Sequence, residues 1–155
     1  MTEAKQIVID WCSQVHWTHP ATINLLPHYK AEFVCRQFIR NFNRAIFGRD
    51  KMRTGLFHLL VLSVYADDSK VKHIHFCFGG FPPLMSIYQI RKAFYKAARQ
   101  TKGVWLERTI PNTVVAVKMV NIECDPTPNK WLSYILRYTK DIDDKHLLIH
   151  QSYFG

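Results

Sequence analysis

Residues 71–80 read VKHIHFCFGG, and this stretch decides the centre of the fold. It is rich in branched and aromatic residues and ends in two glycines, with two prolines close behind, which predicts a strand bounded by breakers. Since successive side chains of a strand point to opposite faces, His73, His75 and Cys77 share one face and the apolar residues between them share the other. Histidine is also common on ordinary solvent faces, so the rest of the chain must decide what the pair does.

The segments on either side of this strand predict paired strands separated by helices. Residues 56–66 form a strand that turns at 67–70 and pairs with 71–78 as a hairpin. Ser86 and Gln89 form a capping box for a following helix, and Gly103 comes after its end. We expect helices over 3–17, 31–47, 87–100 and 129–140, and strands over 20–26, 56–66, 71–78, 104–110 and 114–123.

This order, β-α-β-β-α-β-β-α after the N-terminal segment, predicts an α+β fold. We expect a mainly antiparallel five-stranded sheet with helices packed on one face. The other face would be open and would carry His73 and His75. We expect one domain over 1–155, with an N-terminal helical extension (1–19), a core (20–141) and a tail (142–155).

Composition indicates a globular protein of the cytoplasm. Of the 155 residues, 48% are hydrophobic and 21% are charged, which suits a folded chain with a sizeable core. No apolar run approaches the ~20 residues of a membrane span, and the N-terminus lacks the layout of a signal peptide. The four cysteines lie far apart without a C-x-x-C pattern, so we expect reduced thiols and no zinc knuckle.

The charge balance points to a polyanionic partner. Lysine and arginine number 21 against 12 acidic residues, a formal net charge of +9, which is typical of nucleic-acid binding. Arginines recur every four residues along 31–47 and continue into the next loop. They could form an ordinary solvated helix face, but together they predict a salt-sensitive phosphate track. The predicted nucleic-acid-binding residues are Arg36, Arg40, Arg44, Arg49, Lys51, Arg53 and Lys96.

The last predicted helix carries two tyrosines with basic neighbours. Tyr134 and Tyr138 are four residues apart and therefore lie on the same helical face, with Arg137 and Lys140 nearby. Taken alone, the pattern also fits the buried stripe of an amphipathic helix.

Together, the histidine strand and the tyrosine helix resemble the HUH endonucleases, in particular rolling-circle replication initiators. His73-Ile74-His75 is similar to their His-hydrophobic-His motif, and residues 134–140 (YILRYTK) are similar to their tyrosine motif in its two-tyrosine form. The resemblance spans about residues 20–141. The chain departs from the family where Arg137 replaces the usual lysine, where Lys140 follows Tyr138 by two positions, and where Tyr65 replaces an acidic residue.

The resemblance implies metal-dependent nicking and joining of single-stranded DNA. His73 and His75 would bind Mn²⁺ or Mg²⁺, and imidazole ligands favour Mn²⁺. The third ligand stays open between Asp67 and His58, with Asn24 and Asp141 as further candidates. Tyr134 would be the nucleophile that forms a 5′-phosphotyrosine, Tyr138 a second nucleophile, and Arg137 and Lys140 phosphate contacts.

The sequence also suggests a partner and several alternative functions. The chain has no phosphate-binding G-x-x-x-x-G-K-[ST] motif, so a host helicase would unwind the duplex at a plasmid, phage or virus origin. One alternative is a transposase or relaxase of the same superfamily. Another is a non-catalytic RRM-like module that binds nucleic acid with aromatics on its open face. In the nickase itself, exposed aromatics such as Trp105 or Tyr65 could stack bases. A binuclear hydrolase would need a second His-x-His or paired carboxylates, which we do not find.

Overall fold

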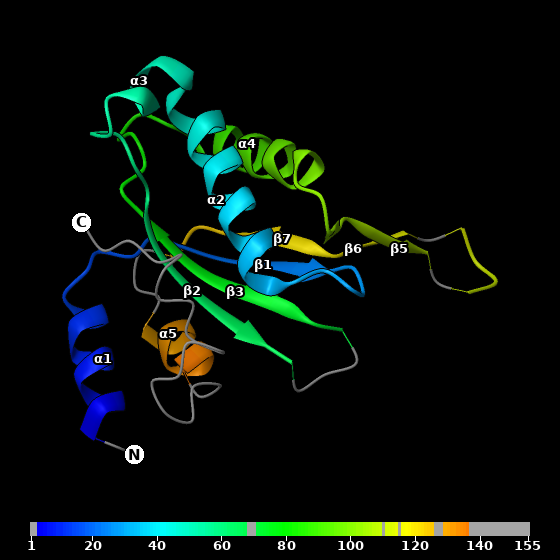
Figure 1. Ribbon diagram of the computed structural model, residues 1–155, viewed down its shortest axis with the longest axis horizontal. Helices are drawn as coiled ribbons and strands as arrows, with labels where there is room; N and C mark the ends of the chain where they lie inside the picture. The colour runs from blue at the N-terminus through cyan, green and yellow to red at the C-terminus, as the bar shows by residue number, and fades with distance from the viewer. Residues whose placement is uncertain (1–2, 68–70, 110, 115, 126–128, 137–155) are drawn as a thin grey trace.

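The computed structural model describes residues 3–67, 71–109, 111–114, 116–125 and 129–136. Its helices are α1 (Glu3–Ser13), α2 (Ala31–Phe47), α3 (Arg49–Arg53), α4 (Ile87–Gln100) and α5 (Asn129–Leu136). Its strands are β1 (His19–Leu25), β2 (Leu60–Ala66), β3 (His73–Gly79), β4 (Val104–Trp105), β5 (Glu107–Thr109), β6 (Ala116–Lys118) and β7 (Val120–Ile122). The α+β class is confirmed, and helices pack against a mainly antiparallel sheet (Figure 1).

The main sheet has five strands, as expected. Its order is β2-β3-β1-β4, and β7 also pairs with β1, so the strand that contains the histidines lies between β1 and β2. All of these pairings are antiparallel. The last two predicted strands each divide in two. β5 and β6 pair only with each other in a hairpin that extends beyond the main sheet, while β4 and β7 return to β1 (Figure 1).

One face of the sheet carries the main hydrophobic core. Ile74, Phe76 and Phe78 of β3 point into it and meet Phe38 of α2 and Phe94 of α4. The aromatic rings interlock: Phe38 lies 5.4 Å from Phe76 and 5.1 Å from Phe94 between ring centroids. The apolar half of the strand pattern therefore packs as predicted, because its period of two matches the pleat.

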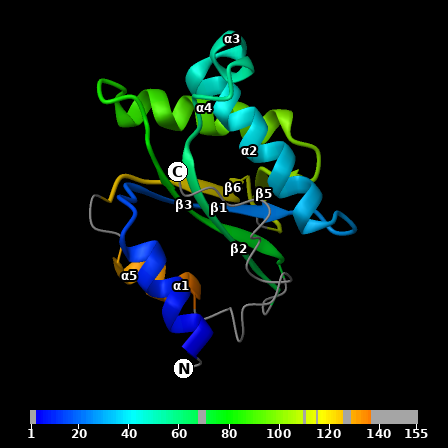
Figure 2. The same cartoon turned by 60° about the vertical axis from the view of Figure 1, so that its left-hand side comes forward.

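The expectation that helices cover only one face was wrong. α1 and α5 lie across the opposite face, as both views show (Figures 1 and 2). A second cluster of buried side chains joins them to the sheet and comprises Val8, Cys12, Trp17, Leu62, Val64, Cys77, Leu132 and Leu136. The reason is visible in β2, where Leu62 and Val64 face away from the main core and must be covered.

The predicted capping box of α4 is present. The Gln89 backbone N–H donates to Ser86 Oγ at 3.2 Å, and the Ser86 backbone N–H donates to Gln89 Oε1 at 2.8 Å. Each bond satisfies a donor that the first helical turn leaves unpaired.

We expect Ser86→Ala to lower the free energy of unfolding by about 1 kcal/mol, because it removes one of these bonds from an exposed helix start. Chemical denaturation followed by circular dichroism measures the change. Ser86→Asp keeps an acceptor oxygen and should stay close to the unmodified protein. Equal losses in both variants would contradict a capping role.

Candidate active site

The histidine pair lies on β3, on the sheet face that α5 covers. His73 and His75 are two residues apart on one strand, and their ring centroids are 4.5 Å apart. His75 is buried, with 5% of its surface exposed, while His73 is partly exposed. The predicted placement of both imidazoles on one face is therefore confirmed, although that face is not open over His75.

Each imidazole is held through its Nδ1 atom. His73 Nδ1 lies 2.9 Å from the Val71 carbonyl oxygen. Since a carbonyl only accepts, Nδ1 carries the proton, and in the neutral ring Nε2 carries the lone pair. His75 Nδ1 lies 3.0 Å from the Thr22 hydroxyl, and when Nδ1 donates to that oxygen, Nε2 again carries the lone pair. Such bonds fix the ring orientation of metal-binding histidines.

Helix α5 brings Tyr134 to this pair. The Tyr134 ring lies 5.7 Å from the His75 ring between centroids, and it stacks on Trp131 at 5.5 Å with an interplanar angle of 18°. Trp131 lies 5.0 Å from His75, and its indole N–H donates to the Phe76 carbonyl oxygen at 2.9 Å. With 37% of its surface exposed, Tyr134 contacts His75 and also meets solvent. Arg137, Tyr138 and Lys140 lie outside the described residues.

The strand next to the histidines carries two polar side chains on the same face. Thr22 is the cross-strand partner of His75, and Asn24 is the partner of His73. Directly opposed side chains in a sheet are about 4.5–5.5 Å apart at Cβ. The Asn24 amide nitrogen donates to the Met119 carbonyl oxygen, and this bond fixes the orientation of the Asn24 amide oxygen. Asn24 was a further candidate for the third ligand. The alternation of residues along a strand puts it on one face with Thr22. Only the strand register shows that Asn24 lies beside His73 and Thr22 beside His75.

The structure does not bring His58 to the histidine pair. His58 precedes β2 and contacts the Gly55 carbonyl oxygen at 2.8 Å. The strand that follows pairs Leu60 with Gly79, at the opposite end of β3 from His73. Six residues of strand separate those ends, which is about 20 Å.

Asp67 lies at the His73 end of the sheet, much nearer to the pair than His58. It follows Ala66, the cross-strand partner of His73, so its charge lies near that end of the sheet. It acts on Tyr65, whose side chain packs on the other face: burial, and then the Asp67 charge, raise the pKa of Tyr65. Among the described residues, no third His, Cys, Asp or Glu side chain joins the two histidines in a metal-binding group. Asp141 lies outside those residues.

Cys77 shares the face of the histidines but is held as a thiol. Burial raises its pKa well above the ordinary value, and burial raises the pKa of Cys12 to about 12. A buried thiol of this kind is neither a ready nucleophile nor a thiolate ligand at neutral pH. All four cysteines are free, as expected.

Part of the predicted basic track lines one pocket. Arg40, Arg44, Arg49 and Arg53 line one open pocket of about 460 Å³ at the junction of α2 and α3. α2 and α3 lie on the side of the sheet opposite α5 (Figure 2). The arginine pocket and the histidine pair therefore lie on opposite sides of the sheet. Arg36 and Lys96 are exposed on α2 and α4, and Lys51 lies over the Phe57 ring at 5.3 Å.

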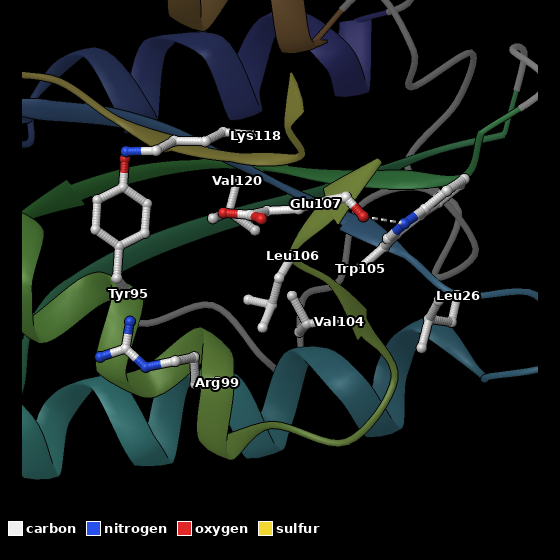
Figure 3. A pocket seen from close by; sticks show the side chains of 9 residues that line it. All are labelled: Leu26, Tyr95, Arg99, Val104, Trp105, Leu106, Glu107, Lys118 and Val120. Carbon is white, nitrogen blue, oxygen red and sulfur yellow. Dashed lines mark hydrogen bonds between the residues drawn. The ribbon is translucent and has the colours of Figure 1, made fainter. Parts of the chain in front are cut away.

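A larger pocket of about 690 Å³ opens at the edge of the sheet formed by β4, β5 and β6, beside α4 (Figure 3). Trp105 lies at one end and Tyr95 at the other. Trp105 was predicted from the sequence as a possible stacking residue. The pocket itself could not be predicted, because the residues that line it come from segments far apart in the chain.

In the described part of the chain, no helix is both long enough and apolar enough to cross a bilayer. Comparison with known protein families, with curated proteins and with solved structures found no match to this chain.

Proposed function

We propose that this protein cuts and rejoins single-stranded DNA by means of a tyrosine nucleophile beside a metal-binding histidine pair. The observation that carries the proposal is the contact between Tyr134 on α5 and His75 on β3, at 5.7 Å between ring centroids. These residues are 59 positions apart in the chain, and their meeting is what the resemblance to HUH endonucleases requires. The net charge of +9 supports a nucleic-acid substrate.

The residues around the pair fit a divalent metal ion. His73 and His75 would present their Nε2 atoms, since Nδ1 of each ring contacts Val71 or Thr22. Asn24 is the cross-strand partner of His73 on the same face, and its amide oxygen would be the third ligand in place of Asp67 or His58. Two imidazoles and one oxygen suit Mn²⁺ better than Mg²⁺. When bound, the ion would act as a Lewis acid on the scissile phosphate.

Tyr134 would carry out the chemical step. Its hydroxyl loses a proton and its oxygen attacks phosphorus, so that a 5′-phosphotyrosine bond forms while the bond to the 3′ oxygen breaks and that oxygen takes up a proton. Attack by a 3′-hydroxyl on the phosphotyrosine reverses the step and rejoins the strand. Tyr138 would make a second cut, and Arg137 and Lys140 would hold phosphate oxygens.

Such a nickase would initiate rolling-circle replication of a plasmid, phage or virus, with a host helicase as a partner. A transposase or relaxase uses the same step on another DNA element. The experiment that tests the chemistry is therefore independent of the element: the protein is incubated with Mn²⁺ and a diverse pool of single-stranded oligonucleotides, and a covalent adduct is sought on a denaturing gel.

We expect the adduct to require the metal and both histidines. EDTA should abolish it, and His75→Ala should lower its yield by about a hundredfold or more, because ligand loss removes the bound ion and its stabilisation of the phosphate. Manganese titration by calorimetry should show the same loss without DNA. His58→Ala is the matched control and should behave like the unmodified protein. Salt-sensitive DNA binding without any adduct would instead indicate a non-catalytic binding module.

A further inference from the structure

We infer that the pocket at the β4–β5–β6 edge of the sheet receives a nucleobase of the single-stranded DNA that the histidine site would cut. The inference deepens the proposed function and takes its substrate class from it. His73 and His75 do not line this pocket. At about 690 Å³, it has the size of a small-ligand site.

The position of Trp105 connects this pocket to the histidines. Asn24 of β1 is the cross-strand partner of His73 on one side and of Trp105 on the other. Cross-strand partners share a face, so these three residues form one row across the sheet. Neighbouring strands are about 4.8 Å apart, which places the Trp105 backbone about 10 Å from that of His73. Trp105 therefore lies at the β4 edge of the face that carries the histidines, while Tyr95, Arg99 and Val104 place the rest of the pocket beside α4, on the other side of that edge. A strand of DNA bound at the histidines would pass round this edge to reach the pocket.

The Trp105 indole is partly exposed and is held by a hydrogen bond. Its N–H donates to the Glu107 carbonyl oxygen at 2.8 Å, which fixes the ring at one end of the pocket (Figure 3). Within the part of the chain that the structure describes, no aromatic ring or cation lies against this indole. A fixed aromatic face is the platform on which single-stranded nucleic acids stack their bases.

The remaining walls suit a base with its phosphate. Val104 and Leu106 form an apolar floor between Trp105 and Tyr95 (Figure 3). Tyr95 itself is covered, because Lys118 Nζ lies over its ring at 4.8 Å. This contact places a cation at the far end of the pocket, where Arg99 adds a second one.

The acidic side chain of the pocket also suits a bound nucleotide. Glu107 is the cross-strand partner of Lys118, and it reaches across the pocket above the apolar floor (Figure 3). A carboxylate accepts hydrogen bonds from the amino groups or ring N–H groups of bases, while Lys118 and Arg99 attract phosphate. Stacking area, one acceptor and two cations together describe a nucleotide within a DNA strand better than they describe a simple anion.

The test measures binding in EDTA, so that it does not depend on cleavage. Fluorescence anisotropy compares a short labelled oligothymidylate with an abasic deoxyribose-phosphate chain of equal length and charge. We expect the unmodified protein to prefer oligothymidylate. Trp105→Ala should weaken oligothymidylate binding by about 5- to 100-fold and leave the abasic chain unchanged. Lys118→Gln should weaken both equally, because it removes a phosphate contact.

Two further variants keep the test decisive. Trp105→Phe retains an aromatic face and should recover most of the preference, which separates stacking from misfolding. Trp11→Ala removes an exposed tryptophan of α1 and should bind like the unmodified protein. Equal binding of both chains by the unmodified protein, or equal losses of both in Trp105→Ala, would overturn the inference. So would binding of free thymidine monophosphate as tight as that of the oligonucleotide, which would assign the pocket to a free nucleotide.

The outcomes of the two experiments are distinguishable. A base preference that depends on Trp105, without any covalent adduct in Mn²⁺, would refute the nicking chemistry and keep the base pocket. An adduct that depends on His75, without a base preference, would refute the base pocket and keep the nicking chemistry.

Discussion

Replacement of Tyr134 by phenylalanine is expected to lower the yield of the covalent protein–DNA adduct about a thousandfold or more. The change removes only the hydroxyl that would attack phosphorus, and loss of a catalytic nucleophile has effects of this order. Phenylalanine can keep the ring contacts with Trp131 and His75, so the fold should be unaffected. Adduct formation with Mn²⁺ and single-stranded oligonucleotides, followed on a denaturing gel over time, measures the loss.

Two other tyrosine variants make this result specific. Tyr88→Phe alters a tyrosine of α4 that is 77% exposed, and it should leave adduct formation unchanged. Tyr138→Phe should retain the first cut if Tyr138 acts second. Normal adduct in Tyr134→Phe together with its loss in Tyr138→Phe would transfer the nucleophile to Tyr138.

Replacement of Phe38 by alanine is expected to lower the free energy of unfolding by about 3–5 kcal/mol. Phe38 has no exposed surface, and its ring contacts those of Phe42, Phe76 and Phe94 at 5.1–5.8 Å between centroids. The change removes this contact area and leaves a cavity between α2, α4 and the sheet. Such a loss is a large part of the ~5–15 kcal/mol that stabilises a typical domain.

Urea denaturation followed by circular dichroism measures this loss. Phe33→Ala serves as the matched control, since Phe33 lies on the same helix with 44% of its surface exposed and should cost far less. A small effect at Phe38, or equal effects at both positions, would contradict the central place of Phe38 in the core.

The two predictions concern the two faces of β3, and the alternation of residues 73–78 anticipated both. Ile74, Phe76 and Phe78 pack on α2 and α4 because a strand directs every second side chain to the same side. His73 and His75 lie on the other side for the same reason. The bounds of α2 and α4 were also predicted, since helical periodicity and the Ser86 capping box are local signals.

Other features of the site depended on residues distant in sequence. No local pattern could show that Leu62 and Val64 require α1 and α5 as a second cover, or that the arginine pocket lies across the sheet from the histidines. The choice between His58 and Asp67 as a third ligand could not be made from local patterns for a similar reason. It depended on the end of β3 that each residue reaches, and therefore on how β2 pairs with it.

The sequence by itself determined the α+β class, the face that His73 and His75 share, and the basic character of the surface, because each follows from the order, alternation or charge of nearby residues. Only the tertiary structure decided that Asn24 lies between His73 and Trp105, that Tyr134 meets His75, and that Trp105 lines a pocket beside α4. Strand register and helix docking set these neighbours, and both arise from the burial of side chains that are far apart in the chain.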